Sequence, residues 1–345
     1  MNCVELFAGA GGAAIGLERA GFRHSALVEW NADACATMRA AGLSPVIHGD
    51  VRDIEAIRAV APDRPGLLWS SFPCQAFSQA GSRQGASDER NGWPWTVDAI
   101  DALLPQWFLA ENVRGLLQHS GEHCGNPLLC PGCYFHGTIL PELRARFGHV
   151  GWWLLDAADY GVPQHRRRVI IWAGPAPLSR PVPTHGTNLR PEVTVRAAIG
   201  AARCMSCDGS GASWSPLFLT RPCGACCGSG QCRIIGNEDV SIVATGRAGG
   251  GVPRSIDRAA PTIGTKGTAM LLRSPPGEKA RPDTPGRRLS WREEARLMGL
   301  PEWWSPYGGD GSKRRQAGNA VPPPLAEAVG RVVIAADALV KRDAD

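Results

Sequence analysis

The stretch Cys3-Val4-Glu5-Leu6-Phe7-Ala8-Gly9-Ala10-Gly11-Gly12 joins an apolar run of strand length to a glycine-rich turn. Residues 13–20 follow with the pattern of a helix, which indicates a strand, a turn and a helix in succession. A turn of this kind brings backbone N–H groups and the amino end of a helix close to a ligand. The glycines do not follow the full dinucleotide spacing, and an ordinary tight turn has the same composition. The stretch alone therefore predicts one βα unit and a candidate binding loop.

The same alternation of apolar runs with helical or turn segments continues through the first half of the chain. Further runs of strand length lie at residues 25–29, 45–48, 66–70, 107–111, 152–155 and 168–172. Alternation of this type predicts βαβ units and a parallel sheet that is covered on both faces. We expect an α/β fold in which residues 1–174 form a Rossmann-like domain.

The character of the sequence changes near residue 174. Proline and glycine are dense from there to about residue 285, which predicts a smaller, irregular domain over residues 175–288. A helical pattern returns after Ser290, which has the spacing of a capping box with Glu293. A final helix is expected over residues 325–340. We expect the C-terminal segment, residues 289–345, to pack back on the first domain.

Charge is distributed unevenly along the chain. Residues 175–290 hold fifteen Lys and Arg against seven Asp and Glu, a balance of +8; the whole chain carries +5, so the remainder carries 5 − 8 = −3. A basic segment in an otherwise slightly acidic chain is typical of a surface that binds a polyanion. A solvated loop region could have the same charge distribution. The sequence has no apolar run of eighteen residues and no visible secretory signal. We therefore expect a cytoplasmic protein with no membrane partner.

Acidic and aromatic residues follow the next two predicted strands. Glu29 ends the run at 25–29, about twenty residues after the glycine turn, where a carboxylate can bind ribose hydroxyls. Trp30 follows directly, and its ring is suited to lie against an adenine face. Asp50 follows the run at 45–48. Its carboxylate can accept a hydrogen bond from an adenine amino group, or it can cap the next helix. Such groups at successive strand ends predict a nucleoside site at the carboxyl edge of the sheet.

Twelve cysteines are present, and without a secretory signal they argue against a disulfide framework. Nine fall in two clusters, whereas Cys3, Cys35 and Cys74 are isolated. Cys74 follows the run at 66–70, in Ser71-Phe72-Pro73-Cys74-Gln75, again at the carboxyl edge of the sheet. A lone cysteine is more often a small buried hydrophobe. The flexible stretch after Cys74 and the polar groups at neighbouring strand ends favour a reactive thiol instead.

Five short segments, in this order, resemble the motifs of the cytosine-5 DNA methyltransferases. They are Phe7-Ala8-Gly9-Ala10-Gly11, Phe72-Pro73-Cys74-Gln75, Glu111-Asn112-Val113, Gln164-His165-Arg166-Arg167-Arg168 and Gln316-Ala317-Gly318-Asn319-Ala320-Val321-Pro322-Pro323. The resemblance covers residues 1–173 and 285–335; it implies that the variable region between them, with the domain expected at 175–288, is the target-recognition domain that reads DNA. Each motif alone is weak, but five in the order of the family are specific.

The resemblance implies a reaction in which Cys74, as a thiolate, attacks C6 of a cytosine and makes C5 nucleophilic. Glu111 is expected to contact N3 and the exocyclic amine, and Arg166 is expected to reach O2. Both would offset charge that develops on the ring. C5 then takes a methyl group from S-adenosylmethionine. The cytosine must leave the stacked duplex before this chemistry can occur.

The resemblance also implies binding residues. Phe7, Gly9, Gly11 and Asn319 join Glu29, Trp30 and Asp50 in the expected S-adenosylmethionine pocket. The expected DNA contacts are Gln75, Ser78 and Arg90 on the loop at 75–92, together with Arg168 and Thr262, the latter beside the flipped base. Arg168 and Gln164 have an alternative role as braces of the active-site strands.

Both cysteine clusters have the spacing of metal sites. Cys204, Cys207, Cys223 and Cys226 form two C-x2-C pairs with fifteen residues between them, which suits a tetrahedral zinc site with four thiolates; a redox disulfide pair is the alternative. The second cluster lies in an insertion at about 119–136. It contains Cys124, Cys130 and Cys133 with His119, His123 and His136, and of the three histidines His136 or His123 is expected as the fourth ligand. We expect structural Zn²⁺ in both, because small Gly- and Pro-rich segments have little core.

These features together predict a monomeric DNA (cytosine-5-)-methyltransferase that acts on duplex DNA, in restriction-modification or in the protection of phage or host DNA. A tRNA cytosine-5 methyltransferase of the same fold is the nearest alternative, and the long variable region favours duplex DNA over it. A DNA-binding protein that has lost catalysis and a zinc redox or chaperone module are two further alternatives.

Overall fold

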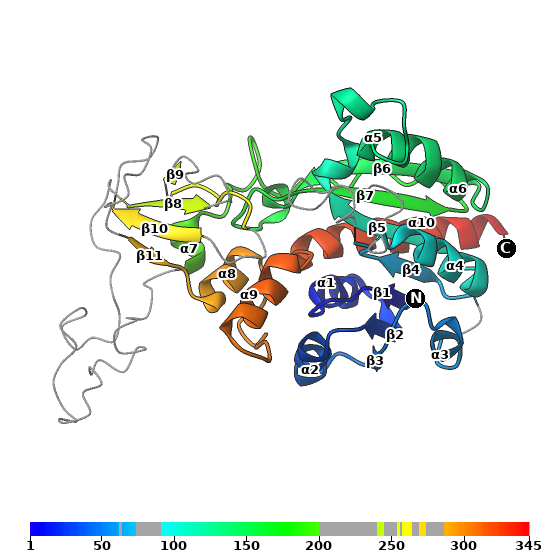
Figure 1. Ribbon diagram of the computed structural model, residues 1–345, viewed down its shortest axis with the longest axis horizontal. Helices are drawn as coiled ribbons and strands as arrows, with labels where there is room; N and C mark the ends of the chain where they lie inside the picture. The colour runs from blue at the N-terminus through cyan, green and yellow to red at the C-terminus, as the bar shows by residue number, and fades with distance from the viewer. Residues whose placement is uncertain are drawn as a thin grey trace.

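The computed structural model describes residues 1–61, 64–73, 91–199, 240–244, 254–255, 257–263, 269–273 and 286–344. Its main part is a seven-stranded sheet in the order β3-β2-β1-β4-β5-β7-β6 (Figure 1). The strands are β1 (Asn2–Leu6), β2 (Arg23–Glu29), β3 (Val46–His48), β4 (Leu67–Ser70), β5 (Trp107–Val113), β6 (His149–Asp156) and β7 (Arg167–Gly174). Each of the strand-length runs read from the sequence thus forms a strand of this sheet, and the α/β fold is confirmed.

The strands do not all run the same way. Neighbours among β1 to β5 pair in parallel, whereas β7 is antiparallel to both β5 and β6. The expectation of a wholly parallel sheet is therefore wrong for β7. Residues 157–166 alone join β6 to β7, and a parallel neighbour would need a crossover of about a dozen residues or more. The chain turns instead through the single helical turn η6 (Ala157–Tyr160).

Helices cover both faces of the large sheet. One face carries α1 (Gly12–Ala20) and α10 (Pro323–Ala344), against which Trp107 and Leu109 of β5 pack. The other face carries α3 (Ile54–Arg58), α4 (Trp93–Leu103), α5 (Pro131–Tyr134), the helical turn η5 (Phe135–Ile139) and α6 (Leu140–Arg144). Phe108 and Ala110 of β5 point to that side. Alternate residues of one buried strand thus contribute to two cores.

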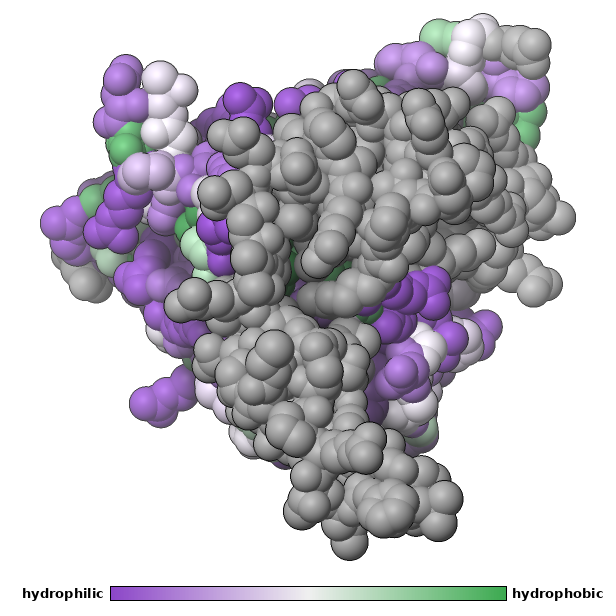
Figure 2. All heavy atoms as spheres, turned by 90° about the vertical axis from the view of Figure 1, so that its left-hand side faces the viewer, coloured by the Kyte–Doolittle hydropathy of each residue, from purple (hydrophilic) through white to green (hydrophobic). Residues whose placement is uncertain are grey.

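A second, smaller sheet lies at the end of the molecule remote from both termini (Figure 1). Its order is β11 (Gly286–Arg288), β10 (Ala269–Arg273), β8 (Val240–Ala244) and β9 (Arg254–Ser255), with all pairs antiparallel. A small core joins it to the helices α7 (Val195–Ile199) and α8 (Trp291–Leu297) through Ile242, Ile263 and Leu297. The described residues visible on this side are mostly hydrophilic (Figure 2).

The C-terminal segment returns to the large sheet. α8 begins at Ser290, whose Oγ accepts from the N–H of Glu293 while the Glu293 carboxylate accepts from the N–H of Ser290, so the predicted capping box is confirmed. α9 (Asp310–Asn319) follows. α10 lies so close to α1 that a side chain at Gly16 would collide with the backbone of Pro323. None of the described helices, α10 included, is long and apolar enough to cross a membrane.

Candidate active site

The glycine turn between β1 and α1 contains three residues with positive φ: Phe7 (55°), Gly9 (56°) and Gly11 (82°). The N–H of Gly9 donates to Glu29 Oε2 at 2.8 Å. The two glycines have different surroundings. A side chain at Gly11 would collide with Leu43, whereas the space beside Gly9 is open. Packing therefore requires Gly11, and Gly9 leaves room for a ligand against the backbone.

Glu29 and Trp30 stand at the carboxyl end of β2. The second carboxylate oxygen of Glu29, Oε1, accepts from the N–H of Asn31 at 2.9 Å. Burial raises the pKa of Glu29, and the hydrogen bonds from the N–H groups of Asn31 and Gly9 oppose that rise. Each carboxylate oxygen retains a lone pair for a further hydrogen bond. The Trp30 side chain is 79% exposed, so its ring is accessible for stacking.

Aromatic and charged side chains lie on one side of the glycine turn. Asp50 forms an ion pair with Arg52, with Oδ2 and Nη2 2.6 Å apart, while Asp53 rather than Asp50 caps α3. The Arg52 guanidinium lies 5.2 Å from the centre of the Trp95 ring, and the rings of Trp95 and Phe7 are 6.4 Å apart. Trp95 was not among the residues that the sequence singled out, because no local pattern relates α4 to the glycine turn.

The C-terminal segment supplies the other side of the turn. The indole Nε1–H of Trp304, a buried residue between α8 and α9, donates to the carbonyl of Ala10 at 3.0 Å. Asn319, expected in the cofactor pocket, is the exposed last residue of α9. The sequence analysis did not single out Trp304 either. A residue nearly three hundred positions from the turn (304 − 10 = 294) thus holds the turn in place.

The chain that leads to Cys74 is anchored to its neighbours. The Asn112 side chain on β5 donates to the carbonyl of Phe72 at 3.0 Å. The N–H of Gly92 donates to the carbonyl of Pro73 at 3.3 Å, so the chain on either side of residues 74–90 is joined by a hydrogen bond. Four expected site residues lie outside the described residues and stay predictions: Cys74, Gln75, Ser78 and Arg90.

Glu111 and Arg168 form an ion pair on neighbouring strands. Glu111 Oε1 lies 2.7 Å from Arg168 Nε, and the two side chains are only 12% and 9% exposed. Glu111 pairs with Ile170 and Arg168 with Val113 in the antiparallel ladder, so the pair is a diagonal contact across the sheet. The ion pair orients the Glu111 carboxylate at the strand end next to Asn112.

Arg166 has different partners. Its guanidinium donates to three backbone carbonyls: Ile263 at 3.1 Å, Gly318 at 2.7 Å and Ala320 at 3.2 Å. Burial holds the pKa of Arg166 well below its usual range, and the charge of Arg168 lowers it further. Arg166 is the residue expected to reach the cytosine, and Arg168 is expected to contact DNA or to brace the strands; in the structure Arg166 is engaged with the backbone, whereas Arg168 is the arginine beside Glu111. Arg166 lies where three carbonyls from distant segments converge, and the Q-x-R-x-R spacing carries no sign of that.

The segment that contains Thr262 lies along residues 164–166. The Thr262 hydroxyl donates to the carbonyl of His165 at 2.6 Å, and the Gln164 side chain accepts from the N–H of Ile263 at 3.2 Å. Gln164 is fully buried, as its alternative role as a brace requires. A contact of Thr262 with a flipped base stays a prediction.

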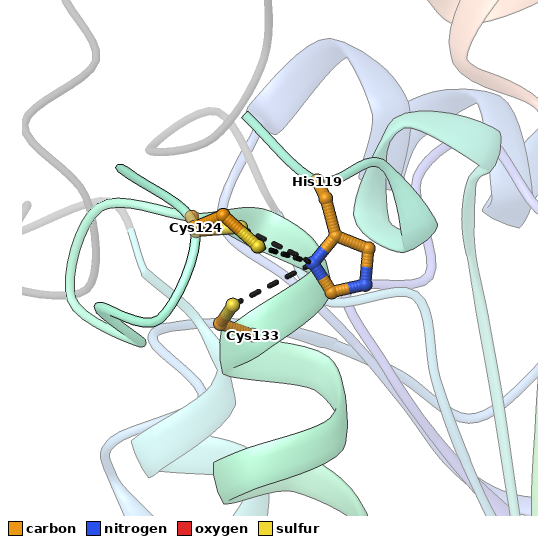
Figure 3. Close-up of side chains that lie close together, drawn as sticks. His119, Cys124 and Cys133 are labelled. Carbon is orange, nitrogen blue, oxygen red and sulfur yellow. Dashed lines mark hydrogen bonds between the residues drawn. The ribbon is translucent and has the colours of Figure 1, made fainter. Parts of the chain in front are cut away.

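One of the two metal-like clusters lies among the described residues. The ligand atoms of His119, Cys124, Cys130 and Cys133 are all within 4.8 Å of one another (Figure 3). The fourth member is His119, so the expectation of His136 or His123 is wrong. The ring of His136 lies parallel to that of His119 at 6.2 Å between centres. The other expected metal residues, Cys204, Cys207, Cys223 and Cys226, lie outside the described residues.

The family model for C-5 cytosine-specific DNA methylase matches residues 1–183 and 243–335. The chain belongs to this family. The type II methyltransferase M.NaeI of Lentzea aerocolonigenes is 33% identical, over 97% of this chain and 75% of its own length. M.NgoMIV of Neisseria gonorrhoeae is 32% identical, over 96% of this chain and 97% of its own. A solved prophage-encoded DNA modification methyltransferase of E. coli has a TM-score of 0.63 at 20% identity, over 97% of this chain and 99% of its own.

Membership of the C-5 cytosine-specific DNA methylases confirms the resemblance read from the five motifs. The matched ranges include β1 to β7 and α8 to α9. The family match therefore covers the glycine turn and the C-terminal residues that contact it. They leave out residues 184–242, in which the four-cysteine cluster lies. A zinc redox or chaperone module, which rested on that cluster alone, does not account for the remainder of the chain.

Proposed function

We propose that the chain is a DNA (cytosine-5-)-methyltransferase that acts on a cytosine in duplex DNA, in restriction-modification or in the protection of phage or host DNA. The family, C-5 cytosine-specific DNA methylase, supports DNA as the substrate. The observation that carries the proposal is the Glu111–Arg168 ion pair, which lies beside the anchored strand end that continues into Cys74. The basic residues at 175–290 suit a DNA-reading domain.

In the proposed reaction the Cys74 thiolate forms a bond to C6 of the flipped cytosine, and the electron density of the ring moves to C5. Glu111 contacts N3 and the exocyclic amine, which offsets charge on the ring. After C5 has been methylated, loss of the C5 proton and of the Cys74 thiolate restores the aromatic ring. Cytosine in a stacked duplex is inaccessible to both residues, so the base must flip out.

We assign the contact with cytosine O2 to Arg168, in place of Arg166. The guanidinium of Arg168 already lies against Glu111, so the two side chains present a carboxylate and a cation side by side. A planar guanidinium keeps donors for a second acceptor after one ion pair has formed. Arg166 has both terminal nitrogens engaged with carbonyls and serves as a brace.

The residues around the glycine turn fit S-adenosylmethionine, which supplies an electrophilic methyl group when bound. Gly9 offers open space beside its backbone, and Glu29 can accept the ribose hydroxyls on its remaining lone pairs. The exposed Trp30 ring suits an adenine face. Asp50 and Phe7 lie on the same side of the glycine turn, where Asp50 contacts Arg52 and Phe7 contacts Trp95. Asn319, exposed at the end of α9, completes the proposed pocket.

Transfer of a tritiated methyl group from S-adenosylmethionine to DNA and to tRNA tests the proposal. We expect transfer to duplex DNA, and a loss of roughly 10³-fold or more in kcat for Cys74→Ser, because a hydroxyl is a far weaker nucleophile than a thiolate. Cys3→Ser is the matched control, since Cys3 is a buried, free cysteine near the amino end of β1, away from the carboxyl edge of the sheet. Transfer to tRNA alone, or full activity in Cys74→Ser, would contradict the proposal.

We also propose that Cys204, Cys207, Cys223 and Cys226 hold a structural Zn²⁺ within the DNA-reading domain. Their C-x2-C spacing supports this. Removal of the ion with a chelator is expected to weaken DNA binding, because a Gly- and Pro-rich segment with little core depends on such an ion for its fold.

A further inference from the structure

A compact group of metal-ligating side chains stands apart from the methyl-transfer residues. His119, Cys124, Cys130 and Cys133 follow β5 in the chain, after the helical turn η3 (Arg114–Leu117). None of the three cysteines is in a disulfide. Figure 3 shows the His119 ring with Nδ1 turned toward the sulfur atoms. The group thus has four ligand atoms around one point and no covalent bond among them.

The distances from His119 Nδ1 to the three sulfur atoms match a tetrahedral zinc site. His119 Nδ1 lies 3.6 Å from Cys124 Sγ, 3.6 Å from Cys130 Sγ and 3.5 Å from Cys133 Sγ. With Zn–S bonds of about 2.3 Å and a Zn–N bond of about 2.0–2.1 Å, a tetrahedral ion separates nitrogen and sulfur by about 3.6 Å. Hydrogen bonds alone do not explain the arrangement, because a single ring nitrogen has one lone pair or one proton to share. A common centre explains all three distances.

The surrounding backbone supports sulfur ligands. The N–H of Gly125 donates to Cys133 Sγ at 3.1 Å, and the N–H of Ser120 donates to Cys130 Sγ at 3.4 Å. Donors of this kind stabilise thiolates and orient the ligands around an ion. Gly132 is also part of the arrangement, because a side chain there would come within 2.9 Å of the His119 ring. The ring therefore rests against the start of α5 only because residue 132 is a glycine.

We propose that His119, Cys124, Cys130 and Cys133 bind one Zn²⁺ as a structural site. Three thiolates and an imidazole are the ligand types that zinc accepts, and four protein ligands leave no open position for a substrate. The segment from Gly121 to Leu129 is largely exposed and contributes no residue to the hydrophobic cores of the described chain. A metal ion supplies the stability that such a segment lacks.

The site also bears on a neighbouring part of the fold. Tyr134 directly follows the ligand Cys133, and its hydroxyl accepts from the Asn91 side chain at 2.9 Å. Gly92, the residue after Asn91, donates its N–H to the carbonyl of Pro73. The ion would therefore fix the start of α5 and, through Tyr134, the position at which the chain enters α4. This role does not depend on methyl transfer.

Zinc content per chain, measured by mass spectrometry of the purified full-length protein, tests the site. We expect His119→Gln and Cys133→Ser each to lose one equivalent of zinc relative to the unaltered chain. His136→Gln is the matched control: its ring lies beside His119 but is not a ligand, so its zinc content should not change. Unchanged zinc in both ligand variants, or the same loss in His136→Gln, would overturn the proposal.

Thiol reactivity of the unaltered protein provides a second test that does not require a variant to fold. Cys124 is exposed, so a free thiol there would react quickly with an alkylating reagent, whereas a zinc-bound thiolate would be protected. We expect a chelator to increase the rate at Cys124 at least tenfold, resolved by peptide mass, with buried Cys35 as the internal control. Equal rates at Cys124 with and without the chelator would overturn the site.

Discussion

Arg166 and Arg168 lie two positions apart in one motif and carry the same guanidinium group, yet the fold gives them different partners. Arg166 binds carbonyls from two distant segments, Ile263 on one side and Gly318 and Ala320 on the other. Arg168 lies on the sheet against Glu111. The distinction arises from which groups stand opposite each side chain, and spacing in the sequence does not contain that information.

Matched lysine substitutions separate the two roles. Lysine presents its donors on a single nitrogen, so Arg166→Lys should leave at least one buried carbonyl without a donor. We expect that loss to lower the free energy of unfolding by about 2 kcal/mol. Arg168→Lys keeps a cation beside Glu111 but loses the planar group, so kcat should fall by about 10- to 100-fold with little change in stability. Thermal unfolding and methyl-transfer assays check this; a stability loss at Arg168 and a purely kinetic defect at Arg166 would contradict it.

The buried residues Glu5 and His24, on the neighbouring strands β1 and β2, lie close to the exposed Glu18 of α1. His24 Nε2 lies 3.3 Å from Glu5 Oε2, and its Nδ1 lies 3.6 Å from Glu18 Oε1. Burial acts to lower the pKa of His24, but the nearby side chains of Cys3, Glu18 and Glu5 outweigh it and raise the pKa to about 12. The folded protein therefore holds a proton on His24 that the unfolded chain releases near pH 6.5.

Because the folded pKa of His24 lies above the unfolded one, its contribution to stability is fully present below about pH 6.5 and declines as pH rises toward 12. We expect the free energy of unfolding to fall between pH 7 and pH 9 by up to about 1.4 kcal/mol per unit. The decline should be smaller in His24→Gln, which carries no proton to release. Chemical denaturation at several pH values measures both slopes, and parallel slopes would rule out His24 as the cause.

At the scale of elements, local rules account for the helices and strands themselves. α8 begins at Ser290 because that side chain satisfies the N–H of Glu293, and Glu293 returns the bond. The alternation along β5 divides its residues between two cores. The direction of β7 follows instead from the short connection after β6, which permits only an antiparallel neighbour. The hydrophobic periodicity along a strand does not indicate whether the neighbouring strand is parallel or antiparallel.

Ser290→Ala tests the capping box of α8. Removal of an N-cap hydroxyl costs about 1 kcal/mol, and the melting temperature should fall by a few degrees. Ser305→Ala is the matched control, because Ser305 is exposed and lies outside the helix, so its effect should stay within about 0.5 kcal/mol. Equal effects of the two substitutions in thermal unfolding would show that the cap does not stabilise α8.

At the scale of the whole molecule, the two ends of the chain build the proposed cofactor pocket together. The glycine turn follows β1, whereas Trp304 and Asn319 come from the C-terminal segment. α10 lies along α1. Ala317 of α9 and Ala320, just after this helix, pack in one core with Ala8 and Ala10 of the turn. We therefore expect a substitution in the C-terminal segment to change cofactor binding at the pocket.

Trp304→Phe keeps an aromatic ring in place but removes the N–H that holds the carbonyl of Ala10. The loss of one buried hydrogen bond, worth about 1 kcal/mol, should loosen the turn and raise KM for S-adenosylmethionine about fivefold, with KM for DNA unchanged. Trp303→Phe is the control, since that ring is exposed. A rise in both KM values, or an equal effect at Trp303, would refute a specific role at the pocket.

The sequence by itself determined the strand-length runs, the capping box of α8 and membership of the methylase family, and it indicated Glu111, Glu29 and the cysteines of the 119–136 insertion. Those features are local, because strand periodicity, caps and motifs depend on residues close together in the chain.

Only the tertiary structure decided the direction of β7, the different partners of Arg166 and Arg168, the position of His119 rather than His136 among the three cysteines, and the contacts of Trp95 and Trp304. The physical reason is the same in each case. A side chain's role is set by the donors and acceptors that distant segments bring to it, and identical residues at neighbouring positions acquire different partners when the chain folds.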